Sequence, residues 1–225
     1  MQVGNKSYRA AADIPRQVPI FPLSGALLLP GAQLPLNIFE PRYLAMFDDA
    51  LNGDRVIGII QPALEGGAAV QQPVEDLCAV GCLGRITSFG ETGDGRYVMS
   101  LGGICRFRVL KELDPGDKPY RTCEISPFLG DLEPSDDATS VDRKALLDSF
   151  RAYLDANNLE ADWSSVERAS TASLVNSLSM MSPYGPAEKQ ALLEADDLKT
   201  RAETLVAITE IALARDSDDY ERVLQ

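Results

Sequence analysis

Hydrophobic residues in the first 125 positions occur in short runs that prolines and glycines interrupt. The run at residues 18–29 and the run at residues 33–38 each have the length of a β-strand or strand pair, and Pro30 with Gly31 predicts a turn between them. Prolines within these runs exclude a long helix, because proline has no backbone N–H and clashes with the preceding turn. Pro41 then suits the first turn of a helix, whose apolar face follows at helical spacing in Tyr43, Leu44, Phe47 and Leu51.

Strand patterns continue to residue 125. We expect strands near residues 54–61, 79–89, 96–101, 104–110 and 121–125, with Asp94-Gly95 forming a hairpin turn. Gly102 and Gly103 predict a bulge or sharp bend between the third and fourth of these segments. In the last long run, Ile104, Arg106 and Arg108 alternate with Cys105, Phe107 and Val109. Five or six strands with one early helix predict a small, partly closed barrel.

Residues 126–140 are rich in proline, aspartate and serine, and we interpret them as a linker. Helical periodicity follows. Leu146, Phe150, Tyr153 and Leu154 form one apolar stripe, and Asn157-Asn158 should end that helix. Ser164 and Glu167 predict a capping box for a second helix that continues to Leu178. Pro186 should begin a third helix, and Asp196 or Asp197 should cap the fourth.

Four blocks of this sequence carry a family resemblance. They are Val18–Leu44 with its Phe39-Glu40-Pro41-Arg42-Tyr43 segment, Asp54–Gln61, Val80–Ile86 and Tyr97–Val109, followed by the helical segments near Glu188–Glu194 and Leu198–Glu203. In this order the blocks resemble the LON substrate-binding domain, the amino-terminal domain of Lon proteases. Cys82 and Gly84 depart from the family pattern. The resemblance runs from about Val18 to about Leu213, and it implies a module that binds proteins rather than one that cleaves them.

The resemblance and the patterns together predict an α+β fold. It consists of an N-terminal extension (residues 1–17), a PUA-like LON β-barrel (18–125), an acidic linker (126–140) and a small α-helical bundle with a frayed acidic tail (141–225). A full Lon protease also has an ATPase and a Ser–Lys protease module. Neither fits after Leu213, so we expect a stand-alone domain with no enzyme activity.

Candidate catalytic chemistry is sparse. The chain contains no histidine, which excludes Ser–His and Cys–His catalysis by this chain alone and any histidine-ligated metal. The paired glycines at Gly66-Gly67 and Gly102-Gly103 do not open a helix at dinucleotide-binding spacing. The four cysteines, Cys78, Cys82, Cys105 and Cys123, lie in apolar segments and are interpreted as buried free thiols rather than a zinc site. We therefore expect neither a cofactor nor a metal.

The net charge of −13 is unevenly distributed. Residues 1–130 contain 14 acidic and 12 basic side chains, giving −2, and residues 131–225 contain 20 acidic and 9 basic ones, giving −11. Such a field repels nucleic acid and anionic lipid at long range. We expect no targeting segment and no disulfide framework, and the sequence has no apolar run of the ~20 residues that span a bilayer. The expected location is cytoplasmic.

Two surfaces remain as candidates for binding. Phe39, Glu40, Arg42 and Tyr43 are the candidate protein-binding surface, although a purely structural helix start explains the same residues. Arg85, Arg106 and Arg108 could form a basic face for RNA, because the LON barrel is similar to the PUA barrel of RNA-modifying enzymes. The alternative is that these arginines solvate the outside of the barrel. We expect a polypeptide substrate or a partner protein, with RNA as the alternative. The identity of the partner and the oligomeric state stay open.

Overall fold

The computed structural model describes residues 1–64, 74, 76–133 and 140–223, with side chains up to residue 215. The chain forms two compact units, one of residues 1–134 and 184–193 and the other of residues 135–183 and 194–225. The elements of the first unit are β1 (Gln2–Val3), β2 (Lys6–Ser7), η1 (Ala11–Asp13), β3 (Gln17–Pro22), β4 (Gln33–Ile38), α1 (Pro41–Asn52), β5 (Val56–Ile60), β6 (Val80–Glu91), β7 (Tyr97–Glu112), β8 (Arg121–Pro127), η2 (Leu129–Leu132) and α5 (Pro186–Glu194).

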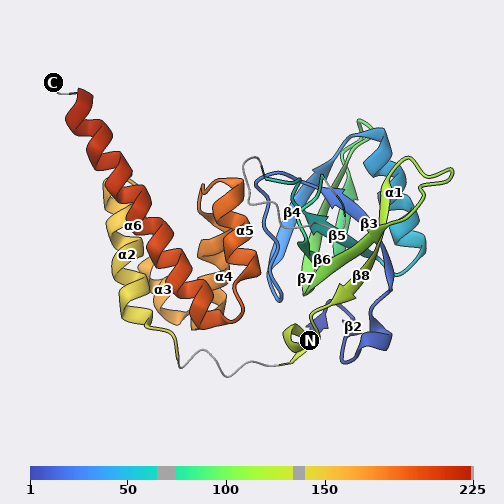
Figure 1. The fold of residues 1–225 in the computed structure, drawn as a ribbon, viewed down its shortest axis with the longest axis horizontal. Coiled ribbons are helices and arrows are strands. Elements are labelled where there is room, and N and C mark those ends of the chain that lie inside the picture. The colour runs from blue at the N-terminus through green and yellow to red at the C-terminus, as the bar shows by residue number, and fades with distance from the viewer. Residues whose placement is uncertain (65–73, 75, 134–139, 224–225) are drawn as a thin grey trace. The chain divides into compact units, whose positions relative to one another are not determined.

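The first unit is a closed β-barrel (Figure 1). The ring runs β7–β6–β5–β3–β8 and returns to β7, and only the β3–β5 pair is parallel. The long strand β7 closes the ring with its second half, while its first half pairs with β4 on the same edge. The predicted α+β class with a mainly β barrel is therefore confirmed.

Strand β7 carries a bulge relative to β6. The β6–β7 register passes from Cys82 opposite Arg106 to Gly84 opposite Gly103, so β7 holds one residue more than β6 across this step. The irregularity expected at Gly102-Gly103 is displaced: both glycines pair in regular register with Arg85 and Gly84, the extra residue lies between Gly103 and Arg106, and β7 runs on as one strand instead of two. Gly103 also allows a close approach, because a Cβ there would lie 2.0 Å from the carbonyl oxygen of Leu29.

The core of the barrel is mostly aliphatic and includes the buried rings of Phe107 and Tyr8. Phe107 is fully buried, and a Cβ on either Gly58 or Gly81 would collide with its ring. Both glycines therefore make room for Phe107. The shared core cluster includes Val18, Ile20, Leu83, Ile104, Cys105 and Cys123.

The structure departs from the expected boundaries at both ends of the barrel. Residues 1–17 are not a separate extension, because Val3, Tyr8 and Ile14 are buried in the barrel core. The α5 helix groups with the barrel rather than with the other helices. Its Gln190 amide donates to the Val80 carbonyl at 3.1 Å and accepts from the Gln61 amide at 3.2 Å.

The second unit is helical. Its elements are α2 (Arg143–Ala156), α3 (Trp163–Arg168), α4 (Thr171–Met181) and α6 (Leu198–Val223). The α6 helix packs against α2 and α4. Asp197 caps α6 by accepting from the Thr200 amide at 2.7 Å, and Asn157 follows the end of α2, as predicted.

The predicted capping box in this unit is wrong. Asp162, not Ser164, caps α3, and its carboxylate accepts hydrogen bonds from the amides of Ser164 and Ser165. Ser170 then caps α4, so the single helix expected to run to Leu178 is two helices, α3 and α4. The helix therefore begins two residues before the predicted position, because the Asp162 carboxylate satisfies two of its free amides. Residues 134–139 of the expected linker lie outside the described residues, and its earlier part extends β8 and forms η2.

Candidate polypeptide-binding surface

The predicted Phe39–Tyr43 segment joins the end of β4 to the start of α1. Glu40 is the N-cap residue and Pro41 occupies the first helical position, which confirms the predicted helix start. The Arg42 guanidinium lies 2.8 Å from the Glu40 carboxylate and also covers the Tyr43 ring, with 4.5 Å between the Cζ atom and the ring centroid. Tyr43 is buried against Phe21, with 4.1 Å between the ring centroids. Tyr43 therefore anchors the helix, while Phe39 is 59% exposed.

The β6–β7 hairpin brings further aromatic side chains to the same helix. Phe47 of α1 lies between two rings of the hairpin, 5.4 Å from Phe89 and 4.6 Å from Tyr97 between centroids. Phe47 is fully buried, whereas Phe89 is 50% exposed and Tyr97 is half-buried. We call Phe39, Phe89 and Tyr97 the aromatic rim. Figure 1 shows α1 on the outside of the barrel, beside the strands that carry this rim.

Charged groups border the aromatic rim. Arg96 lies over the Phe39 ring, 5.9 Å from its centroid, and is paired with Asp94 at 3.2 Å. The negative charge of Asp48 raises the pKa of the Tyr97 phenol above its ordinary value. An apolar centre with a charged border is the usual composition of a protein-binding patch.

The expected basic face is only partly assembled: Arg106 and Arg108 both lie over the Phe128 ring, 5.1 and 5.7 Å from its centroid, while Arg85 has other partners. Arg85 is buried and donates to the Asp54 carbonyl at 3.0 Å and to the Asn5 side chain at 3.1 Å. Arg106 is buried and forms a bidentate ion pair with Asp131. Only Arg108 is exposed, where it lies over the Phe128 ring. Two of the three guanidinium groups are thus committed to interior partners, which differs both from a basic face and from a solvated outer face.

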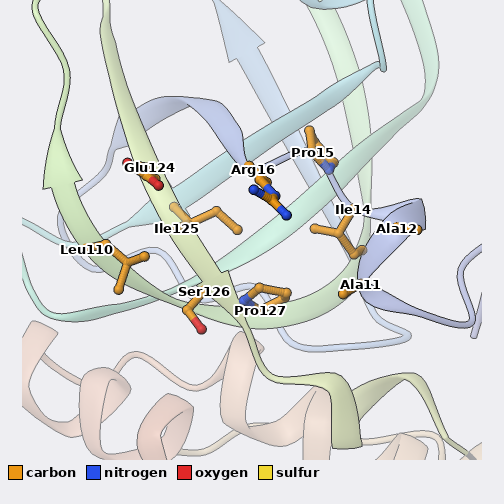
Figure 2. A pocket seen from close by; sticks show the side chains of 10 residues that line it. All are labelled: Ala11, Ala12, Ile14, Pro15, Arg16, Leu110, Glu124, Ile125, Ser126 and Pro127. Carbon is orange, nitrogen blue, oxygen red and sulfur yellow. The ribbon is translucent and has the colours of Figure 1, made fainter.

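A groove of about 580 Å³ lies elsewhere on the same unit, between η1 with the residues after it and β8. Figure 2 shows Arg16 and Ile125 between Leu110 on one side and Ile14 on the other. Leu110 is 49% exposed, and Glu124 at the groove is 3.4 Å from Lys111. The groove mixes apolar and polar lining, and no catalytic set of side chains converges there.

The cysteines are buried thiols of low reactivity. All four are free and buried, as the sequence predicts. Burial raises the pKa of the Cys105 thiol to about 12 and that of Cys123 to about 11, so neither forms a thiolate readily. Among the described residues, no group of three or more Cys, Asp or Glu side chains is placed to hold a metal ion.

Sequence reasoning missed Phe89 and Tyr97 as members of the site. The signal was the presence of aromatic residues on both sides of the Gly90–Gly95 turn, since a hairpin brings residues near the two ends of its turn within contact of each other. Phe89 and Tyr97 are diagonal neighbours across the β6–β7 pair, with 6.4 Å between their ring centroids. None of the helices that the structure describes has both the length and the apolar character needed to cross a bilayer.

Comparisons with known proteins agree with this architecture. The family model of the ATP-dependent protease La (LON) substrate-binding domain matches residues 17–210. The Lon protease of Flavobacterium johnsoniae is 27% identical over 201 residues, and that of Parabacteroides distasonis is 32% identical over 199 residues. The alignments cover 86% and 85% of this chain but only 24% and 23% of those proteases. The chain thus spans about a quarter of the length of these curated relatives.

Solved structures show the same likeness. The Lon N-terminal domain protein from Xanthomonas campestris is 28% identical and superposes with a TM-score of 0.59, covering 85% of this chain and 97% of that one. The N-terminal domain of the Mycobacterium avium complex Lon protease has a TM-score of 0.64 over 86% of this chain and 98% of that one, and at 18% identity it supports the fold alone. The family model covers most of the chain, and the structural likeness extends through its helical part. The chain therefore belongs to the LON substrate-binding domain family.

Proposed function

We propose that this chain is a non-catalytic protein-binding module that recognises polypeptide substrates or a partner protein, with a role in protein quality control. The observation that carries the proposal is the aromatic rim. Phe39 and Phe89 are large apolar side chains held at least half exposed at the junction of β4, α1 and the β6–β7 hairpin. Water-exposed aromatic side chains that a rigid scaffold supports are typical contact residues in protein recognition.

The rigidity of the scaffold supports the proposal. Phe47 packs beneath Phe89 and Tyr97, and the ladder between β4 and β7 pairs Ile38 with Tyr97. Binding at the rim would therefore cost little ordering of the protein itself. Family membership supports the same conclusion, since the matching model is named for substrate binding.

The electrostatics favour polypeptide over RNA. Binding of RNA through phosphates needs several available cationic groups, and Arg85 and Arg106 already serve interior partners. The net charge of −13 adds long-range repulsion of any polyanion.

Fluorescence anisotropy across a salt series tests the proposal. One probe is reduced, carboxymethylated α-lactalbumin as an unfolded polypeptide, and the other is a structured RNA hairpin. We expect binding of the polypeptide that changes little between low and physiological salt, because apolar contacts are weakly screened. RNA binding that falls roughly tenfold or more over the same range, with no polypeptide binding at any salt, would contradict the proposal.

A further inference from the structure

The free edge of the sheet is the second feature that suits a polypeptide. Strand β4 pairs with β7 on one side only, and no described residue pairs with its other side. Gln33, Pro35 and Asn37 alternate along this strand and are all exposed. An edge strand of this kind presents unpaired backbone groups that match another extended chain.

The alternation of hydrogen bonds along β7 shows which backbone groups of β4 bond to β7 and which face outward. At the hairpin, the Thr92 amide donates to the Arg96 carbonyl at 3.1 Å, which places Arg96, and with it Val98 and Ser100, in the pairs that bond to β6. The intervening residues of β7 therefore bond to β4, and their partners are Leu34, Leu36 and Ile38.

The position of Pro35 agrees with this assignment of bonding and outward-facing residues. Pro35 lies opposite Ser100 and has no N–H to donate, so it can occupy only a position that does not bond to β7. The outward groups are therefore the N–H and C=O of Gln33, the C=O of Pro35 and the N–H and C=O of Asn37. They are spaced as the bonding groups of an antiparallel or parallel partner strand are spaced.

Side chains beside the β4 edge would also contact an added strand. Leu34 and Leu36 lie on the core side of β4 and are only half-buried, so a strand added at this edge would cover them. Phe39 follows directly after β4 and would contact the same added strand at its end. We propose that the β4 edge takes up an extended apolar segment of a bound polypeptide as an additional β-strand. This inference rests on the proposed polypeptide-binding function and assigns it a mode of recognition.

Pro35 decides between a polypeptide and a second copy of this chain. Two copies of β4 paired antiparallel over Gln33–Asn37, with their outward groups facing each other, would place Pro35 opposite Pro35, and both central donors would be missing. A different polypeptide supplies an N–H opposite the Pro35 carbonyl and loses only one bond. The edge therefore favours a foreign strand over self-association.

The test uses the full chain and a labelled peptide of alternating valine and threonine with lysines at both ends. The same peptide, methylated on its backbone nitrogens, keeps the side chains and loses the donors. We expect the methylated peptide to bind at least about tenfold more weakly, because several backbone hydrogen bonds are removed. Equal or tighter binding of the methylated peptide would overturn the inference.

Variants of the edge test the same point from the protein side. Asn37→Pro removes an outward donor and should weaken binding about two- to tenfold, whereas the control Asn37→Thr keeps the donor and the affinity. Pro35→Val adds a donor and should tighten binding by a similar factor. If both Asn37→Pro and Pro35→Val bind the peptide with unchanged affinity, and circular dichroism shows that they are folded, the proposal of strand addition at the β4 edge is overturned.

Failure here is distinguishable from failure of the proposed function. If unfolded α-lactalbumin binds while the valine–threonine peptide does not, polypeptide binding stands and strand addition is wrong. If Pro35→Val dimerises in analytical ultracentrifugation and still does not bind the peptide, the occupant is a second copy and the inference is overturned.

Discussion

Arg106 and Asp131 form a buried ion pair that ties β7 to η2. The Arg106 Nε lies 2.9 Å from Oδ2 and Nη2 lies 2.9 Å from Oδ1, while the backbone N–H of Arg106 donates to Oδ2 at 2.8 Å. Nη1 donates further to the Leu193 carbonyl at 3.3 Å. This arginine therefore serves the fold of the first unit at three places and is not available to a phosphate.

Breaking this pair should be costly. We expect Asp131→Ala to lower the free energy of unfolding by about 3–5 kcal/mol, because it leaves a buried guanidinium without its carboxylate. The control Arg42→Ala removes an exposed pair with Glu40 and should cost at most about 1 kcal/mol. Urea unfolding measures both. A loss below about 1 kcal/mol in Asp131→Ala would show that the pair does not stabilise the fold.

Phe39 offers a clean test of the aromatic rim. We expect Phe39→Ala to weaken binding of an unfolded polypeptide at least about fivefold, because it removes a large contact side chain. Its stability should change by no more than about 0.5 kcal/mol, since the ring is 59% exposed. Leu129→Ala, at an apolar residue of η2 that is 43% exposed, is the matched control and should bind normally. Equal losses in the two variants would indicate general surface hydrophobicity instead of a defined rim.

We expect the stability of the protein to depend strongly on which glycine is replaced by alanine. A methyl group at Gly103 would collide with the backbone carbonyl of Leu29, so Gly103→Ala should destabilise the protein by about 1–3 kcal/mol or more. Gly90→Ala is the control, because no atom lies within 4 Å of a Cβ at that position. Thermal unfolding of both variants checks this. If their melting temperatures are the same, the close approach between residues 29 and 103 is contradicted.

The buried thiols predict a loss of stability at alkaline pH. The pKa of Cys105 in the folded state is about 12 and that of Cys123 is about 11, above the ordinary thiol value in each case, so the unfolded chain loses these protons first. Their contribution is complete below the ordinary thiol pKa and decreases as pH rises toward the folded values. The slope is at most about 1.4 kcal/mol per pH unit for each thiol.

Urea unfolding between pH 8 and pH 10.5 measures this slope. The double variant Cys105→Ala with Cys123→Ala has no such thiols and should show a flatter dependence on pH. If the variant and the parent chain show the same dependence, the alkaline sensitivity comes from other groups.

Local structure could be predicted from the sequence because local signals specify it. Pro41 fixes the start of α1, and Asp197 caps α6 through the Thr200 amide. The burial of Arg106 could not be predicted in this way. Alternation along a strand assigns faces, but the register shift opposite Cys82 and Gly84 breaks the alternation, and four consecutive residues from Ile104 to Phe107 are buried.

The candidate site was only partly predictable for a similar reason. Phe39 could be found from its position before a helix start, whereas Phe89 and Tyr97 join it through strand pairing and through Phe47. The place of α5 beside the barrel depends on long-range bonds such as that from the Gln190 amide to the Val80 carbonyl, which no local pattern encodes.

Hydrogen–deuterium exchange of the full chain, with and without reduced, carboxymethylated α-lactalbumin, tests whether a polypeptide binds at the aromatic rim. We expect slower exchange in peptides that cover residues 33–44 and 88–98, where β4, the start of α1 and the hairpin carry the aromatic rim. Peptides from α2 and α4 should exchange at unchanged rates. Protection that is confined to the helical unit or to the groove near Arg16 and Ile125, or no protection at saturating polypeptide, would contradict binding at the aromatic rim.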